Sequence, residues 1–461
     1  MIDGGRELRL ASVIALFAMA AALSPAASAG ERVARDSLRV GLSRTCITPG
    51  APLWLHGYAS ESRFRPYEGK LNDLFAKAMA IEDSAGGRAV LITLDLCVLR
   101  PAEAKMLFDR LMARTGLGRQ QLVVNFSHTH SAPIIGSSDF SRYPMPEAIQ
   151  QNTLSYTERL FGLIADAAVS ALADLKPARV GWGRGKCRFV RNRRLYRADG
   201  GYDRMGPNPD RYVDDTVPVL RIDAPDGGPR AIVFGCACHA VTLDSQNLSL
   251  SGDYPGFAQE AVESRMAGVQ AMFVQGCGAD ANSEPRCGPD QVKHARAQGE
   301  DLAAEVCRVA AGPLERVIGP MRLKFSEVDL PLKQPPAAEL RKMTGYMGHN
   351  AKRMLAAIEG GKVLSSHHRH PLAVWQFGEG PAFIWLSGEV VSAYVPLVRR
   401  ALGTDRLWIA GYSNEVDGYL PDSTIVHEGG YEARGLVADI GFYSAEAEAI
   451  LVNAVRDLAS E

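Results

Sequence analysis

The chain has 461 residues, of which 46% are hydrophobic and 22% charged, and its 51 Lys and Arg nearly balance 52 Asp and Glu to give a formal net charge of -1. This composition is typical of a globular protein, and the balanced charge excludes nucleic-acid binding driven by phosphate neutralisation as well as a polybasic membrane patch. The length permits one large domain or two to three smaller ones.

The first 29 residues have the three regions of a secretory signal peptide. Arg6 and Arg9 precede an apolar run over residues 10–23, and the small residues Ala27-Ser28-Ala29 follow it. The apolar run is shorter than the roughly 20 residues that a membrane-spanning helix needs. We therefore expect cleavage after Ala29, a periplasmic or secreted mature protein, and no transmembrane span in it. A retained anchor is the competing interpretation.

Eight cysteines lie beyond this predicted cleavage point. An even number in an oxidising compartment permits some disulfides, but it is too small for a disulfide scaffold in a chain of this length. Several of the cysteines stand in apolar, strand-like runs where buried free thiols are common. The pairing therefore stays open.

Apolar runs rich in β-forming residues alternate with helix-period segments along the chain, which predicts an α/β fold with mixed sheets and flanking helices. Strands are predicted at 88–96, 121–126, 217–222, 231–238, 271–275, 321–328, 381–386 and 407–410. Helices are predicted at 101–114, 146–172, 256–266, 289–311, 337–358, 390–402 and 444–458. The polar stretch 199–215 is interpreted as a long surface loop. No repeat or long linker interrupts the pattern, so residues 30–461 are expected to form a single domain.

Residues that bind metals follow several of these strands. His128 and His130 come directly after the strand that ends at Phe126, and their imidazoles would share one side if the chain stayed extended. His239 follows a second strand, and Glu389 follows a third after a glycine turn. Histidine and glutamate are common ligands of catalytic zinc. The alternatives are hydrogen-bonded surface histidines, and a Glu389 that only stabilises a helix dipole.

Several sequence segments are similar to one known family. They occur in family order over nearly the whole mature chain: VGLSRTCITPG (40–50), HGYA (56–59), NFSHTHSAP (125–133), RNRR (191–194), LSGDYPGFA (250–258), FVQGCGADAN (273–282), LSGE (386–389), and GYSNEVDGY with GGYEA (411–433). With these segments the chain resembles the catalytic N-terminal domain of the neutral/alkaline non-lysosomal ceramidases.

The resemblance implies a catalytic zinc ion with four protein ligands, which match His128, His239, Glu389 and Tyr419. Tyrosine is an unusual ligand because its ordinary pKa is about 10, so Tyr419 is read either as a ligand or as a hydrogen-bonded neighbour of the metal. The implied catalytic residues are His130 as the proton carrier, and Arg193 and Tyr431 as groups that bind the substrate or an oxyanion. Asn282 is a further catalytic candidate, which could polarise the oxyanion.

Asn282 is also the first of two departures from the family pattern. The matching position in ceramidases carries a serine, and in this chain Ser283 comes one residue later. An acyl-serine route is therefore doubtful, and we expect direct attack of a metal-bound water on the carbonyl carbon. The second departure is length, because ceramidases carry a C-terminal immunoglobulin-like domain that we do not expect here. The expected absence of this domain argues against ceramide as the substrate more strongly than it argues against hydrolysis as the reaction.

The sequence therefore predicts an exported, zinc-dependent amidase with a ceramidase-like catalytic domain. Its substrate would be a small-molecule N-acylated, lipid or glycan-type compound. Two alternatives stay open: an enzyme that uses the same zinc on an ester or carbohydrate, and a non-catalytic binding protein on the same scaffold. Two further residues are expected near the site, His56 as part of the pocket lining and Asp280 as a carboxylate that orients a zinc-binding histidine.

Overall fold

The computed structural model describes residues 38–438 and 440–460. The predicted signal peptide lies outside the described residues. Within them, no helix is both long and apolar enough to cross a membrane.

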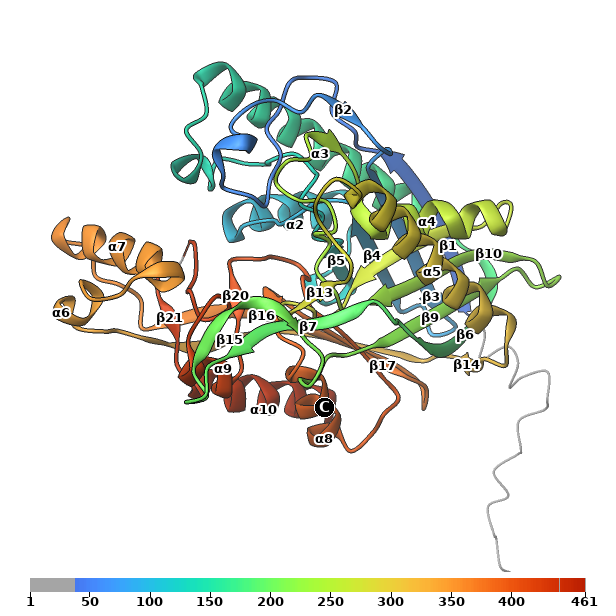
Figure 1. Cartoon of the computed structure of the whole chain (residues 1–461). Helices are drawn as coiled ribbons and strands as arrows, with labels where there is room; N and C mark the ends of the chain where they lie inside the picture. Colours follow the sequence, from blue (N-terminus) through green and yellow to red (C-terminus); the bar gives the residue numbers. More distant parts are fainter. Residues whose placement is uncertain (1–37, 439, 461) are drawn as a thin grey trace, which may run out of the picture.

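Two packed β-sheets form the centre of the described structure, and helices cover the outer face of each (Figure 1). The first sheet has the strand order β12-β10-β9-β6-β1-β3-β4-β5, with β14 paired to β6. Its strands are β1 (Leu38–Cys46), β3 (Phe75–Asp83), β4 (Arg88–Leu94), β5 (Leu122–Phe126), β6 (Lys176–Lys186), β9 (Thr216–Asp223), β10 (Pro229–Cys236), β12 (Gln270–Gln275) and β14 (Glu315–Val317). Most neighbours are antiparallel, but β4 with β5 and β10 with β12 run parallel.

The second sheet has the order β19-β17-β16-β15-β21. Its strands are β15 (Met321–Lys333), β16 (His367–Phe377), β17 (Ala382–Leu386), β19 (Leu407–Ala410) and β21 (Phe442–Tyr443). Three small sheets lie beside these two. They pair β2 (Gly69–Lys70) with β11 (Ser249–Leu250), β18 (Glu389–Val390) with β20 (Tyr419–Leu420), and β7 (Val190–Tyr196) with both β8 (Tyr202–Asn208) and β13 (Ala281–Ser283).

The helices divide between the two outer faces, except for two at one end of the molecule. The α-helices are α2 (Pro101–Thr115), α3 (Glu147–Ala173), α4 (Asp253–Arg265), α5 (Gln291–Ala311), α6 (Ala337–Leu340), α7 (Gly345–Glu359), α8 (Tyr394–Leu402), α9 (Ser423–Glu428) and α10 (Glu446–Ser460). Short 3-10 turns occur at η1 (Glu61–Arg63), η2 (Arg119–Gln121) and η3 (Phe140–Arg142). Helices α2 to α5 pack on the first sheet, α8 and α10 pack on the second, and α6 and α7 project at one end (Figure 1).

Some strands of both sheets, such as β4 and β17, are buried on both faces, which explains their continuous apolar sequences. In β4, Leu91 faces the layer between the sheets, whereas Val90 and Ile92 face the helices α2 and α3. In β17, Trp385 faces the layer between the sheets and Ile384 faces the helices on the other side. This alternation follows from the two-residue period of a strand.

The structure confirms the predicted α/β class and corrects three of the predicted elements. The segment 199–215 is not only a loop, because β8 forms a hairpin with β7, and the exposed, polar face of β8 hid it from a hydrophobicity pattern. The helix predicted at 337–358 is divided into α6 and α7 before Gly345, whose φ of +57° is left-handed. The helix predicted from 390 begins at Tyr394, because Glu389 and Val390 form β18. All eight cysteines lie in the described part and are free thiols.

Candidate metal centre

Four of the expected metal-binding residues come together where the two sheets meet. His128 follows β5 and His239 follows β10, both in the first sheet. Glu389 begins β18, just after β17 of the second sheet, and pairs in register with Tyr419 at the start of β20. Bridges between Asn125 and Ser413 and between Gly276 and Ala410 join the two sheets next to this point. The topology therefore brings residues from distant parts of the sequence to one buried place.

The backbone at His128 differs from the extended conformation that we expected. Its φ is +58°, a left-handed value that is uncommon outside glycine. The backbone N–H groups of Ser127 and His128 donate to the carbonyls of Leu94 and Leu96, which hold this turn. The rings of His128 and His130 still meet, with centroids 4.8 Å apart. Strain of this kind is concentrated at functional sites.

Three side-chain atoms that can accept a hydrogen bond converge in the candidate metal centre: Nε2 of His128, Nε2 of His239 and Oε2 of Glu389. His128 Nδ1 lies 2.9 Å from the carbonyl oxygen of Cys97, and His239 Nδ1 lies 2.9 Å from that of Gly278, so each Nδ1 carries the proton and donates it. The two Nε2 atoms then face Glu389 Oε2, at 3.2 Å from His128 and 3.1 Å from His239. No hydrogen bond from the described residues reaches Glu389 Oε2 with acceptable geometry. Lone pairs that face each other in a buried site need a cation between them, so this set fits a metal ion.

The protonation states agree with a cation site. Burial acts to raise the pKa of Glu389, but His128 and His239 outweigh it and hold the pKa well below its usual value. For His239, burial and the charge of Arg193 lower the pKa to about 3. For His128, burial acts to lower the pKa, but Cys97 and Glu389 outweigh it and raise the pKa to about 10. Without a metal, a proton on His128 therefore takes the place of the cation.

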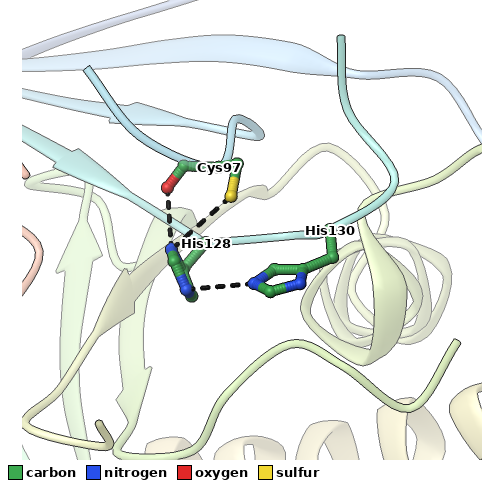
Figure 2. A group of neighbouring side chains, drawn as sticks. All are labelled: Cys97, His128 and His130. Carbon is green, nitrogen blue, oxygen red and sulfur yellow. Dashed lines mark hydrogen bonds between the residues drawn. The ribbon is translucent and has the colours of Figure 1, made fainter. Parts of the chain in front are cut away.

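A second set of metal-binding side chains shares His128 and consists of Cys97, His128 and His130 (Figure 2). His128 stands between the other two, with Cys97 Sγ 3.8 Å from Nδ1 and His130 Nε2 3.1 Å from Nε2. Nδ1 of His128 already donates to the Cys97 carbonyl at 2.9 Å, so it is not available as a ligand. The set with His239 and Glu389 is therefore the better candidate, and His130 lies beside it.

Tyr419 and Arg193 border the metal centre on the other side. The Tyr419 hydroxyl lies 3.4 Å from His239 Nε2, and it accepts a hydrogen bond from Arg193 Nη2 at 3.1 Å. Arg193 Nη1 donates to Asn282 Oδ1 at 3.3 Å. Burial and the charge of Glu389 raise the pKa of Tyr419 well above 10, so without a metal it is a neutral phenol. Tyr431 packs edge-on against Tyr419, with ring centroids 5.4 Å apart.

Asn282, and not Ser283, faces the candidate site. The Ser283 hydroxyl is fully buried and pairs with Thr242 Oγ1 at 2.7 Å, because neighbouring residues of β13 point to opposite sides. His56 is buried and pairs with Asp139 at 3.1 Å. The prediction for Asp280 is wrong: its carboxylate accepts from Asn192 and from the backbone and hydroxyl of Ser392, while backbone carbonyls orient the histidines.

Sequence reasoning missed two residues that support the site. Tyr412 has its hydroxyl 3.3 Å from His239 Nδ1, and its ring lies 4.6 Å from that of His128. Glu432 accepts a hydrogen bond from Arg193 Nε at 2.8 Å and fixes the guanidinium. Both residues lie in GYSNEVDGY and GGYEA, two of the segments that carry the family resemblance. This resemblance was the sequence signal that could have identified them.

The fold and these contacts define an α/β protein with a candidate metal centre at the ends of its strands. The chain belongs to the neutral/alkaline non-lysosomal ceramidase family, whose N-terminal domain matches residues 38–299. This confirms the family resemblance of the sequence.

Similarity to individual proteins covers part of their length. Neutral ceramidase A of Dictyostelium discoideum is 26% identical over 246 residues, which are 51% of this chain and 33% of that protein. Neutral ceramidase 2 of Arabidopsis thaliana is 24% identical over 236 residues, 49% of this chain and 30% of that protein. The chain thus matches about a third of the length of these relatives.

Solved ceramidase structures share the fold. The neutral ceramidase from Pseudomonas aeruginosa superposes with a TM-score of 0.69 at 20% identity, over 92% of this chain and 74% of that one. A ceramidase complexed with C2 gives the same TM-score at 18% identity, over 92% of this chain and 75% of that one. The mixed α/β architecture is therefore that of the neutral ceramidases.

Proposed function

We propose that this chain is an exported zinc-dependent hydrolase that cleaves an amide (N-acyl) bond. The observation that carries the proposal is the convergence of His128 Nε2, His239 Nε2 and Glu389 Oε2 in a buried site, where they form one of the sets that could hold a metal ion. Membership of the ceramidase family supports the class of reaction. Ceramide, an N-acylated lipid, is the substrate that the relatives' names suggest.

His128, His239 and Glu389 would hold the zinc ion, and Tyr419 would approach it as a fourth ligand or as a hydrogen-bonded neighbour. Two histidines and one glutamate are a known ligand set of catalytic zinc. When bound, zinc acts as a Lewis acid that polarises a carbonyl and makes water a stronger nucleophile. The backbone carbonyls of Cys97 and Gly278 fix the ring orientations that such binding requires.

The remaining residues would move the proton and hold the developing charge. Burial and the neighbouring His128 and His239 lower the pKa of His130 well below its usual value, so its ring is neutral and can accept a proton from water. Arg193 and Asn282 stand where they can orient and stabilise an oxyanion, and Tyr431 can donate to the substrate. In the balanced reaction, one water adds to the carbonyl carbon, the C–N bond breaks, and the amine leaves with the proton.

Residues 30–461 would form the mature catalytic domain after removal of the signal peptide, with a periplasmic or secreted location. Sequencing the N-terminus of the protein recovered from the cell exterior or periplasm tests this part of the proposal. A protein that still begins at Met1 would contradict it.

Metal removal tests the proposed reaction. We expect the purified protein to release fatty acid from ceramide or another N-acyl amine, to lose at least about 100-fold of this rate after chelation, and to recover it when zinc is returned. Metal content measured on the same samples shows whether the loss follows the metal. Full activity in the metal-free protein would contradict zinc dependence, and a metal-loaded protein that hydrolyses no N-acyl amine would contradict the reaction.

Substitution of Gly57 tests the role of His130. Gly57 has a φ of +96°, and a Cβ added there would lie 2.3 Å from Cγ of His130. We expect Gly57→Ala to displace the imidazole and to lower turnover by on the order of 100-fold, while the metal content stays at the parent level. Gly86→Ala is the matched control, because Gly86 has a similar φ of +83° and a Cβ there meets no atom within 4 Å. Unchanged turnover in Gly57→Ala would contradict a proton-carrying role for His130.

A further inference from the structure

A cavity of about 790 Å³ reaches the candidate metal centre. Glu389 and Tyr431 belong to its lining, so a molecule bound there has access to the residues that would carry out hydrolysis. Its size is within the range of small-molecule binding sites, roughly 300–1,000 Å³. The chemistry of its other walls therefore bears on the substrate.

Helix α7 supplies one wall of the cavity. Tyr346, His349, Asn350 and Arg353 all line it, and their spacing of three, four and seven residues places them on one face of the helix. Lys352 lines the cavity from the edge of the same face. Because α6 and α7 project at one end of the molecule (Figure 1), this wall stands apart from the two sheets that carry the metal centre.

The cavity lining is strongly basic. Among the described lining residues, the one carboxylate is that of Glu389, and a bound zinc ion would neutralise it. The arginine and lysine side chains of the lining are Arg100, Arg142, Lys352, Arg353 and Arg434. The cavity therefore carries an excess of positive charge in a protein whose overall charge is close to zero.

Two of these cations share one carboxylate behind the wall. Arg100 binds both oxygens of Asp139 at 3.1 Å, and Arg142 binds Asp139 Oδ1 at 3.1 Å. His56 also approaches the same carboxylate, at 3.1 Å. The single carboxylate of Asp139 thus pairs with two arginines and a histidine, so this side of the cavity has no excess of negative charge.

The other three cations have no ion pair with a carboxylate within residues 38–438 and 440–460. Arg353 donates to the carbonyl oxygen of Val437. Arg434 lies over the rings of Tyr419 and Tyr431, with its Cζ atom 4.8 and 4.3 Å from their centroids. Burial and the charge of Arg142 lower the pKa of Arg353, although Asp417 acts in the opposite direction.

We propose that the natural substrate is an N-acylated amine that carries an anionic oxygen group, which Lys352, Arg353 and Arg434 bind. This inference rests on the proposed hydrolase function. A neutral lipid such as ceramide gains nothing from three cations that form no ion pair with a carboxylate in the described part of the chain, whereas charge-assisted hydrogen bonds to a carboxylate or sulfonate are among the strongest polar contacts. For an N-acyl amino acid, water adds to the carbonyl carbon, the C–N bond breaks, and the products are a fatty acid and the free amino acid.

Three soluble substrates with the same acyl chain test the inference: N-dodecanoylglycine, N-dodecanoyltaurine and N-dodecanoylglycinamide. The first carries a carboxylate, the second a sulfonate and the third a neutral amide. With the zinc-loaded protein, we expect kcat/KM to be at least about 10-fold higher for one or both anions than for the neutral compound. The preferred anion identifies the group that the cavity recognises, and equal values for all three compounds would overturn the inference.

A pair of variants assigns the preference to the cavity wall. The double variant Lys352→Gln with Arg353→Gln is expected to raise KM for the anions. The ratio of kcat/KM between the preferred anion and the neutral compound should fall below about 3-fold. Lys342→Gln is the matched control, because Lys342 is an exposed lysine near α7 that does not line the cavity, and it should keep the parent ratio. A ratio that persists in the double variant would overturn the assignment to this wall.

Binding of compounds that cannot be hydrolysed separates this inference from the proposed function. We would measure the Kd of the ketone in which CH₂ replaces the amide nitrogen of N-dodecanoylglycine, together with that of its carboxamide. Tighter binding of the carboxylate by at least about 10-fold supports the inference even if no amide is cleaved, in which case the proposed function fails alone. Hydrolysis of all three substrates with equal kcat/KM, and without any carboxylate preference in binding, supports the function and overturns the inference.

Discussion

Replacement of His239 by alanine is expected to remove the metal and the activity together. His239 contributes Nε2 at 3.1 Å from Glu389 Oε2, and its other nitrogen is fixed by the Gly278 carbonyl. Loss of a residue that only orients a ligand typically costs 10–100-fold in metal affinity or activity, so loss of a ligand should cost more than about 100-fold. Elemental analysis and the rate of N-acyl hydrolysis, measured on the same sample, check this prediction.

Two further variants make the His239→Ala result specific. Glu389→Gln keeps the size of the side chain but removes its negative charge, so it should also lose metal even where the fold is intact. His294→Ala, on helix α5 away from the site, should keep both metal and activity. If His239→Ala retained one metal ion per chain and the parent rate, the metal assignment would be wrong, whereas parallel loss in His294→Ala would indicate a general effect of the substitutions on folding.

Elements buried on both faces were predictable from the sequence. Strands such as β4, β5 and β19 are continuous apolar runs, and the predicted spans differ from the observed ones by a few residues at most. β3 was missed because half of its apolar positions are alanines, Ala76, Ala78 and Ala80, which do not favour strands. Its strand conformation comes from pairing with β1 over its full length and with β4, contacts that a local pattern does not contain.

The candidate metal residues were found by residue type and position at strand ends, helped by the family resemblance. What could not be predicted is the set of groups that hold them. The Cys97 and Gly278 carbonyls that fix His128 and His239 are backbone atoms, and any residue type could supply them. The basic wall of α7 was hidden for a different reason: a helix face with Arg353 normally points to solvent, and only the tertiary structure turns it toward a cavity.

Replacement of Glu432 by glutamine is expected to destabilise the protein strongly. The Glu432 carboxylate is 1% exposed and pairs with Arg193 Nε at 2.8 Å through one oxygen and with Arg194 Nη1 through the other. Both guanidinium groups are themselves buried. Glutamine would leave them without their shared negative charge, and breaking a buried pair in this way costs about 3–5 kcal/mol of unfolding free energy. Denaturant unfolding of the metal-free protein at pH 7 measures the difference.

The pH dependence and a neighbouring glutamate distinguish this explanation from a simple packing defect. Burial acts to raise the pKa of Glu432, but Arg193 and Arg194 outweigh it and lower the pKa from 4.5. A lowered pKa contributes stability that is complete above pH 4.5 and is lost as the pH falls through the value in the folded protein. The difference between parent and Glu432→Gln should therefore be largest at neutral pH and shrink on acidification.

Glu428 is the matched control, because it also pairs with Arg194, at 3.1 Å, but is 13% exposed. Glu428→Gln should cost less than Glu432→Gln, since water can replace part of the Glu428 contact and Arg194 keeps its pair with Glu432. Arg193 also reaches Tyr419 and Asn282, so Glu432→Gln should lower N-acyl hydrolysis as well, with metal content close to that of the parent. A similar stability loss in both variants, or a difference that does not depend on pH, would show that the buried charge of Glu432 does not hold Arg193 and Arg194 in place.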